Sequence, residues 1–299
     1  MKKKILITGS AGFLFGNYIR RLIYLHNKSE IYNGIDLNVV SIDLLKSNPK
    51  HSMYNNKNHS FYIADIRDKG ILNTLFNLEK PDIVIHGASD NSNAKDIIST
   101  NIIGTNNIIE KCIEHNSDMI YISETDLENQ SQYSQYFATK LCAENFIKSN
   151  NKLRYNILRF PEIFGPKQNK QELIPSLIFY LKKDIPCYVE NDGLIDRLHV
   201  FDACSAITAV LGSKEYKKIY NASNSDLHTD IDIALRIQSI MMKSDLVSKH
   251  SDMTSISRSS ADSNNLFQLG WRPSYNVNNN LNEQCVQWYL KNNWFLEKN

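Results

Sequence analysis

The chain has 299 residues, of which 42% are hydrophobic and 22% charged, so it can bury a large core like an ordinary globular protein. Its net charge of +2 favours no special partner, and Lys2, Lys3 and Lys4 are interpreted as the solvated start of a strand, so we expect no nucleic-acid binding. The apolar runs are too short for a membrane span and no signal-type stretch opens the chain, so we expect a cytoplasmic protein without membrane contact. The five cysteines are scattered, so we expect no metal site.

The first element is a short apolar strand, followed by a glycine turn and a helix. Residues 3–8 predict the strand, Gly9 and Gly12 form the turn, and residues 17–23 have helical spacing. This order places a pyrophosphate on a helix N-terminus, where free backbone N–H groups meet its charge. The pattern would put a third glycine at position 15, but the chain has Phe15 followed by Gly16. We therefore expect a dinucleotide site that must accommodate an aromatic ring.

Asp43 stands at the end of the second predicted strand, residues 37–42. A carboxylate at this place accepts hydrogen bonds from the adenosine ribose and disfavours a 2′-phosphate. The sequence therefore predicts NAD in preference to NADP. The alternative is an ordinary turn aspartate.

Strand and helix signals alternate through the first half of the chain. Strands are predicted at residues 61–64, 83–86, 119–123 and 155–160, and helices at 71–76 and 97–113. This alternation predicts an α/β fold, a Rossmann-type doubly wound parallel sheet. Beyond residue 165 it loosens, and helices are predicted at 174–181, 231–242 and 281–290. We predict an NAD-binding domain at residues 1–165 and a smaller, mainly helical substrate lobe at 166–299, with some C-terminal segments returning to the sheet.

Tyr136 and Lys140 are four residues apart, so on a helix they share one face. A neighbouring ammonium favours the phenolate and would lower the Tyr136 pKa from its usual value of about 10. Tyr136 could then act as general base toward an alcohol. Tyr24 and Lys28 have the same spacing at the tail of the first helix, where we expect a structural pair. The alternative for Tyr136 and Lys140 is likewise a surface pair.

The motifs together resemble those of an extended short-chain dehydrogenase/reductase acting on nucleotide sugars, nearly from end to end. The similarity is greatest to the dTDP-glucose 4,6-dehydratase branch. The matching motifs are Thr8-Gly9-x-x-Gly12-Phe13, Asp65-Ile66-Arg67-Asp68, residues 81–88, Asn101-x-x-Gly104-Thr105-Asn106, Tyr136-x-x-x-Lys140, Arg159-Phe160, Phe164-Gly165-Pro166, Tyr220-Asn221, residues 269–273, Trp288-Tyr289 and Asn293-Trp294.

The resemblance implies a role for each matching residue. It implies NAD binding by Gly9, Ala11, Gly12, Phe13 and Leu14 at the pyrophosphate, Asp43 at the ribose, Asp65 and Ile66 at the adenine, and His86, Gly87, Ala88, Ser89 and Pro161 toward the nicotinamide. Lys140 would bridge the nicotinamide ribose and Tyr136. Ser123, Glu162 and Arg197 would bind the nucleotide-sugar substrate, with Arg197 on the diphosphate. The alternative for Arg197 is a surface ion pair with Asp196 or Asp202. The family commonly forms homodimers.

The segment after Ser123 departs from the dehydratase pattern. In that branch Ser is followed by Thr-Asp-Glu, which binds the sugar hydroxyl and supplies acid and base for loss of water. Aligned without a gap, Glu124 takes the place of Thr; with one inserted residue, Thr125 and Asp126 match and Leu127 replaces Glu. We predict Thr125 and Asp126 as catalytic together with Tyr136 and Lys140. Glu162 stands where a substrate-binding Asn is common.

These features predict transient oxidation at the sugar 4-position by NAD. A 4,6-dehydratase is the first expectation, and a 4-epimerase or 4-keto-reductase is the alternative because dehydration needs an additional acid and base. A non-catalytic NAD- or nucleotide-sugar-binding protein is a further alternative, suggested by Phe15 and the altered segment after Ser123.

Overall fold

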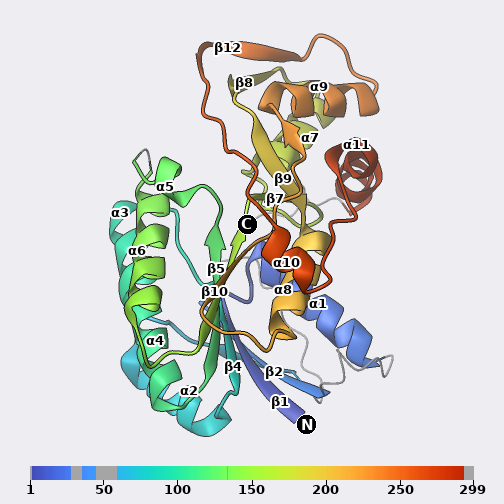
Figure 1. Cartoon of the computed structure of the whole chain (residues 1–299). Helices are drawn as coiled ribbons and strands as arrows, with labels where there is room; N and C mark the ends of the chain where they lie inside the picture. The colour runs from blue at the N-terminus through green and yellow to red at the C-terminus, as the bar shows by residue number, and fades with distance from the viewer. Residues whose placement is uncertain (1, 28–35, 45–58, 133, 293–299) are drawn as a thin grey trace. The chain divides into compact units, whose positions relative to one another are not determined.

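The computed structural model describes residues 2–27, 36–44, 59–132 and 134–292 (Figure 1). The chain divides into two compact units, each treated separately below. The first comprises Met1–Arg159 and Ile207–Tyr220, and the second Phe160–Ala206 and Asn221–Asn299.

The first unit is built on a seven-stranded sheet with the order β10-β6-β5-β4-β1-β2-β3. Its strands are β1 (Lys2–Thr8), β2 (Asp36–Asp43), β3 (His59–Ile63), β4 (Ile83–His86), β5 (Asp118–Glu124), β6 (Tyr155–Phe160) and β10 (Lys218–Asn221). The pairs from β3 through β2, β1 and β4 to β5 are parallel. The strand order reverses direction at β1, and parallel sheets bind ligands beside such a point, outside the carboxyl ends of the strands.

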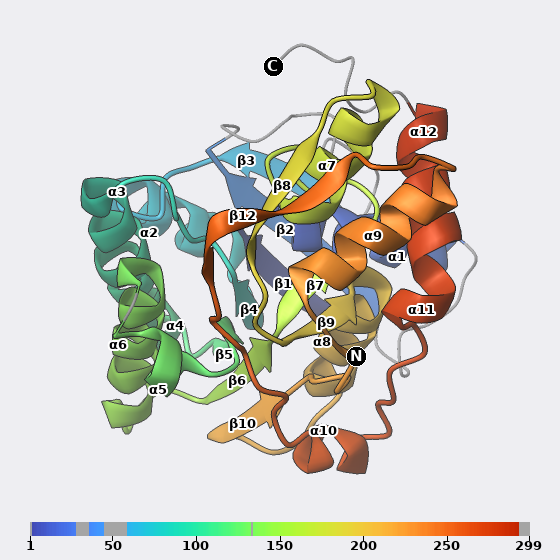
Figure 2. The same cartoon turned by 90° about the horizontal axis from the view of Figure 1, so that it is seen from above.

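Helices cover both faces of this sheet, as the predicted doubly wound fold requires. Helices α2, α4 and α6 lie on one face and α1 on the other (Figures 1 and 2). The helical segments of the unit are α1 (Phe13–Asn27), α2 (Lys69–Glu79), α3 (Ala94–Ile98), η2 (Ser99–Gly104), α4 (Thr105–Glu114), α5 (Leu127–Gln130) and α6 (Gln135–Ser149). The single helix predicted at 97–113 is thus interrupted by η2, a π-helical segment.

The core of this unit forms where apolar strands meet the apolar stripes of α2, α4 and α6. All four residues of β4 are buried, which fits a strand covered on both faces. Leu6, Val84 and Ile157 of the sheet share one cluster with Ile108 of α4 and Ile147 of α6. This packing sets the position of α6 against the end of β5.

Glu144 and Arg159 form an ion pair inside this unit. Glu144 is fully buried, and its two carboxylate oxygens accept from Arg159 Nε at 2.8 Å and Nη2 at 2.6 Å. Replacing Glu144 by Gln removes the charge while keeping the side-chain shape. We expect this change to lower the free energy of unfolding by about 2 kcal/mol, as measured by urea denaturation, because the guanidinium loses a charged partner. An unchanged unfolding midpoint and slope would show that the pair contributes nothing.

The second unit carries two small sheets and several helices. Its strands are β7 (Glu162–Phe164), β8 (Cys187–Asn191), β9 (Ile195–His199), β11 (Leu227–His228) and β12 (Val247–Thr254), in sheets of order β11-β9-β7 and β12-β8. Its helices are α7 (Leu173–Lys182), α8 (Val200–Leu211, whose last turn belongs to the first unit), α9 (Asp230–Ile240), α10 (Asn264–Gln268), α11 (Val277–Asn280), η3 (Leu281–Gln287) and α12 (Trp288–Asn292). Leu177, Ile233 and Tyr289 belong to its core.

Within the described ranges, no helix is long and apolar enough to cross a membrane. The same ranges hold no group of three or more His, Cys, Asp or Glu side chains that could bind a metal ion. All five cysteines are free thiols.

Candidate active site

The glycine turn after β1 has a shape that side chains would prevent. Gly9 has a φ of +73°, and a Cβ added to it would lie 2.8 Å from backbone atoms of Ala88. Both the positive φ and the close approach require glycine. Gly12 N–H donates to Gly9 O at 3.1 Å, and α1 starts at the next residue, Phe13. The turn therefore leads directly into the N-terminus of a helix.

Asp43 lies beside this turn at the end of β2. Its Oδ2 accepts from Ala11 N–H at 2.9 Å. The carboxylate is therefore placed at the glycine turn that leads into α1, as expected of an acidic ribose-binding residue.

The ring of Phe15 is buried and packs beneath Gly87. Its exposed fraction is 3%, so it does not line an open crevice. A Cβ added to Gly87 would lie 2.3 Å from Phe15 Cε2. Position 15 of α1 thus carries Phe where the pattern expects glycine, and Gly87, in the segment after β4, leaves room for its ring.

A buried chain of hydroxyl and imidazole groups connects β1 with the segment after β4. Thr8 Oγ1 accepts from Ala88 N–H at 3.1 Å and lies 2.6 Å from His86 Nδ1, while His86 Nε2 lies 2.9 Å from Thr105 Oγ1. Burial, with the nearby charge of Lys140, lowers the His86 pKa to about 3, so the imidazole is neutral. We infer that Thr8 donates to Nδ1 and that Nε2 carries the proton. The predicted cofactor residue His86 therefore orders the backbone of Gly87 and Ala88.

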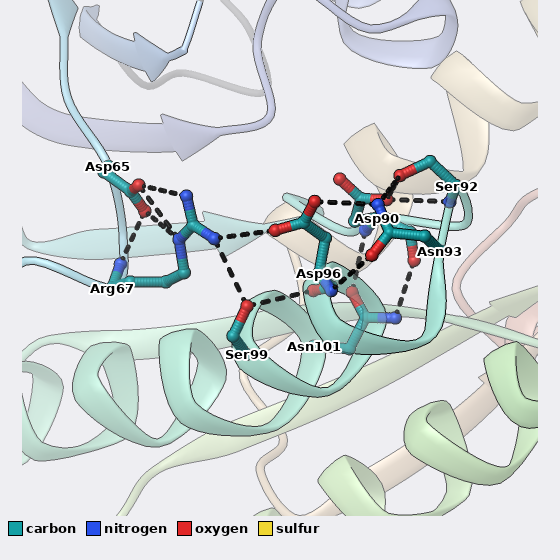
Figure 3. Close-up of polar contacts among 8 residues, drawn as sticks. All are labelled: Asp65, Arg67, Asp90, Ser92, Asn93, Asp96, Ser99 and Asn101. Carbon is teal, nitrogen blue, oxygen red and sulfur yellow. Dashed lines mark hydrogen bonds and ion pairs between the residues drawn. The ribbon is translucent and has the colours of Figure 1, made fainter.

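Figure 3 shows the polar contacts beyond the ends of β3 and β4. The carboxylate of Asp65 pairs with Arg67 at 2.7 Å, and Arg67 Nη1 donates to Asp96 at 3.1 Å and to Ser99 at 3.2 Å. The neighbouring Ile66 is buried. These contacts tie the predicted adenine-binding segment to α3 and η2.

Asn101, in the π-helical segment η2, organises the segment that carries Ser89. Its Oδ1 accepts from Asp90 N–H at 2.8 Å, and its Nδ2 donates to Asp90 O at 2.9 Å and to Thr139 Oγ1 at 3.0 Å (Figure 3 shows the contacts with Asp90). Thr139 in turn donates to Tyr136 O at 2.7 Å. One side chain thus fixes the segment after β4 to the helix that presents Tyr136 and Lys140.

The phenol of Tyr136 donates a hydrogen bond to Glu124 Oε1 at 3.0 Å. Burial raises the Tyr136 pKa well above 10, and the charge and hydrogen bond of Glu124 raise it further, whereas a hydrogen bond with Ser89 lowers it. The predicted lowering of this pKa by Lys140 is therefore wrong for this arrangement. Burial of the phenol, followed by the carboxylate of Glu124, outweighs the expected effect of the ammonium.

Lys140, four residues after Tyr136 on α6, is buried, and its ammonium points to the backbone of β5. Its Nζ donates to Ile122 O at 2.6 Å and lies 4.5 Å from the centroid of the Tyr121 ring. Burial lowers its pKa from 10.5 to about 8, although Glu124 and Glu144 act in the opposite direction. The ammonium form is thus retained at neutral pH in a nearly solvent-free place.

Replacing Lys140 by Met tests this burial through the pH dependence of stability. Between pH 8 and 10.5 the unfolded chain binds more protons at Lys140 than the folded chain does, because the folded pKa is the lower one. The unfolding free energy of the wild type should therefore rise relative to K140M across this window, by at most about 3 kcal/mol. Urea denaturation at both ends of the window measures the difference. Parallel pH profiles of the two proteins would contradict a lowered pKa.

The polar residues in the last part of β5 and in the segment after it have different surroundings. Ser123 Oγ is buried and has no hydrogen-bond partner in the described part of the chain, so it is available to a ligand. Thr125 is buried. Asp126 has a φ of +61°, and its carboxylate accepts from Asn129 at 2.5 Å and Gln130 at 3.1 Å. The catalytic roles of Thr125 and Asp126 stay predictions, whereas Glu124, just before them in the chain, accepts a hydrogen bond from Tyr136.

Arg197 and Glu162 meet in the second unit. Arg197 is fully buried; its Nε donates to Glu162 at 3.3 Å, its Nη1 donates to His228 O at 2.7 Å, and its Nη2 pairs with Asp230. The alternative of a surface ion pair with Asp196 or Asp202 is therefore wrong. Pro161, the residue that connects β6 and β7 in the chain, is buried.

Glu124 and Asn101 are the functional candidates that the sequence reading did not select. Asn101 belongs to a motif of the resemblance, but its two contacts with the backbone of Asp90, eleven residues earlier, cannot be read from the motif. Glu124 was noted as a departure, and its contact with Tyr136 follows from its place as the last residue of β5.

Comparison with known proteins agrees with this architecture. The family model for the NAD dependent epimerase/dehydratase family matches residues 5–223, more than half of the chain. The dTDP-D-glucose 4,6-dehydratase of Mus musculus is 27% identical over 331 residues, covering 98% of this chain and 90% of that protein.

Solved structures show the same fold over the whole chain. A dTDP-glucose 4,6-dehydratase from Streptomyces venezuelae with NAD bound has a TM-score of 0.85 at 22% identity and covers 98% of this chain and 99% of that one. A UDP-glucose 4-epimerase from Thermotoga maritima has a TM-score of 0.83 at 21% identity and covers 97% of this chain and 99% of that one. The predicted Rossmann-type fold is confirmed. So is the predicted family, for the chain belongs to the NAD-dependent epimerase/dehydratase family.

Proposed function

We propose that this protein is an NAD-dependent nucleotide-sugar 4,6-dehydratase. The observation that carries the proposal is the group of Tyr136, Glu124 and Lys140 at the carboxyl end of β5, in the same unit as the glycine turn. The relatives named dTDP-glucose 4,6-dehydratase support the reaction class, since one of them aligns with 98% of the chain.

The residues present fit NAD, the cofactor of this family. A Cβ on Gly9 would lie 2.8 Å from the backbone of Ala88, so this close turn needs glycine, and Asp43 accepts a hydrogen bond from Ala11 in the same turn. Gly9, Ala11, Gly12, Phe13 and Leu14 would hold the pyrophosphate, Asp43 the ribose, Asp65 and Ile66 the adenine, and His86, Gly87, Ala88, Ser89 and Pro161 the nicotinamide half. NAD supplies the oxidising power when bound. We propose residues 1–165 as its domain and residues 166–299 as the substrate lobe.

The chain's own residues would then handle the proton of the sugar 4-hydroxyl. Tyr136 receives this proton, and Lys140 holds a positive charge behind the phenol. Ser123 Oγ, which is buried and unpartnered, would donate to or accept from the sugar. We propose Arg197 and Glu162 as substrate contacts on the second unit, with Arg197 toward the diphosphate. A homodimer and a cytoplasmic location are further proposals; the free thiols support a reducing compartment.

A 4-epimerase or 4-keto-reductase is the second candidate. Leu127 is fully buried where the one-residue insertion would place the dehydratase Glu, and Asp126 is engaged by α5. Oxidation at the 4-position needs no elimination acid and base, so these features favour the second candidate.

The test is incubation with dTDP-glucose and UDP-glucose in heavy water, followed by mass spectrometry and NMR of the products. Dehydration gives a 4-keto-6-deoxy sugar that has lost water and carries solvent deuterium at the 5-position. A 4-epimer without deuterium at that position would exclude the dehydratase and establish the second candidate. Absence of any product across a wide panel of nucleotide sugars would favour a binding protein.

A further inference from the structure

The hydrogen bond between Tyr136 and Glu124 has a defined direction. The phenol O–H donates and the carboxylate oxygen accepts, over 3.0 Å. A phenolate at this place would have no proton to donate and would face a negative charge. The structure therefore holds Tyr136 as a neutral phenol with its proton already directed at a base.

Glu124 is surrounded by the groups that act on this proton. Lys140 of α6 and Tyr121 of β5 both interact electrostatically with Glu124, and Ser89 from the segment after β4 contacts the phenol. Glu144 lies on α6, as Lys140 does, and its charge raises the pKa of Lys140 and of Tyr121 in β5. The buried ammonium of Lys140 faces the carboxylate of Glu124, while Glu144 is paired with Arg159 at 2.6 Å, so each carboxylate has a cationic neighbour.

We propose that Glu124 is the final proton acceptor of the oxidation step and that Tyr136 relays the proton to it. In the alignment without a gap, the dehydratase pattern has a threonine where this chain has Glu124. A threonine hydroxyl is too weak a base to accept and hold the proton. Here a carboxylate takes that place, so the enzyme needs no phenolate at its working pH. This inference rests on the proposed oxidation of a sugar hydroxyl.

The step balances in atoms and electrons. The 4-hydroxyl of the sugar gives its proton to Tyr136 Oη while the phenol gives its own proton to Glu124. The C–H bond at the 4-position breaks, and NAD, when bound, would supply the oxidant that takes up its electron pair as hydride. The sugar C–O bond becomes a carbonyl. In a 4-epimerase the reverse sequence would return proton and hydride to that carbonyl, whereas in a 4,6-dehydratase the 4-keto group would remain and, after loss of water, the hydride would end at C6 and the proton at C5.

The first test needs neither substrate nor cofactor turnover. Full-length protein labelled with ¹³C at the ζ carbon of tyrosine is titrated by NMR, and Tyr136→Phe assigns the resonance. In Glu124→Gln and Glu124→Thr, Tyr136 should ionise at a lower pH than in the wild type, because a neighbouring negative charge is gone. The matched control is Glu128→Gln, which removes an exposed carboxylate paired with Arg159 at 3.3 Å. It should leave the titration unchanged.

The second test compares this titration with activity. In the wild type, kcat/KM should reach its plateau at a pH where Tyr136 is still a neutral phenol. In E124T the plateau should be lost: kcat/KM at neutral pH should fall by about 10²-fold and then rise in step with the phenolate signal. Glu124→Asp should restore the plateau, which a merely structural role of Glu124 would not explain.

Two results would overturn the proposal. One is a wild-type kcat/KM that climbs in parallel with the phenolate signal of Tyr136. The other is a Tyr136 titration that is the same in E124Q, E124T and the wild type. If no nucleotide sugar is turned over, the proposed function fails, while the NMR comparison still decides whether Glu124 controls the proton of Tyr136.

Discussion

Replacing Tyr136 by Phe is expected to lower kcat by about 10²–10⁴-fold on any nucleotide sugar that the wild type converts. The substitution removes one hydroxyl, which donates to Glu124 and contacts Ser89. Without it, the sugar proton has no relay to the base. The ring and its edge contact with Phe137 are kept, so the fold should remain. Initial rates at saturating NAD and sugar measure the effect, and calorimetry with NAD shows whether the cofactor still binds.

Tyr24 provides the matched control, because Tyr24 and Lys28 repeat the spacing of Tyr136 and Lys140. The Tyr24 side chain lies on α1 and is 57% exposed. Tyr24→Phe should leave kcat within experimental error of the wild type. Equal activity of Y136F and the wild type would remove the catalytic assignment and favour a binding protein.

The elements of the first unit could be predicted because their signals are local. The strand Ile83–His86 begins with three apolar residues and is buried throughout, and α2 follows a turn whose Asp68 caps Gly70 and Ile71. The π-helical turn at Ser99–Gly104 could not be read from periodicity, since a π-helical turn differs from an α-helical one by one residue. The positions of Tyr136 and Lys140 on one helix followed from their spacing.

The electrostatics of the site could not be predicted in the same way. The spacing of Tyr136 and Lys140 indicated their proximity but not that Lys140 points to Ile122 O or that Glu124 reaches the phenol. Such contacts depend on side-chain rotamers and on where β5 ends. Similarly, the contacts of buried Arg197 are with Glu162 of β7 and with His228 and Asp230, where β11 leads into α9, and these two stretches are far apart in the sequence.

Phe15 shows how a departure from a motif can be absorbed elsewhere in the fold. The pattern expects glycine at this position of α1, where helix and sheet approach closely. Phe15 is 3% exposed and makes an edge contact with Tyr18. The space for its ring exists because position 87 lacks a Cβ, which would lie 2.3 Å from Phe15 Cε2. The two positions should therefore be energetically coupled.

Phe15→Ala is expected to lower the free energy of unfolding by about 3–5 kcal/mol, since it empties a buried ring-sized volume. Gly87→Ala should cost about 1–3 kcal/mol in the wild type through overpacking. In the double variant the added methyl group has free space, so its cost should vanish and the two effects should deviate from additivity by about 1–3 kcal/mol. Urea denaturation of the four proteins measures this cycle.

Gly70→Ala is the control for a glycine substitution without the ring. Gly70 is exposed in the first turn of α2, and the contact within 4 Å of an added Cβ is Asp68 Oδ1 at 3.2 Å. It should change stability by no more than about 0.5 kcal/mol. Additive effects of F15A and G87A would show that the ring does not occupy the space beside Gly87. Tighter NAD binding by F15A than by the wild type would show that the ring competes with the cofactor, whereas equal affinity agrees with a ring buried outside the dinucleotide site.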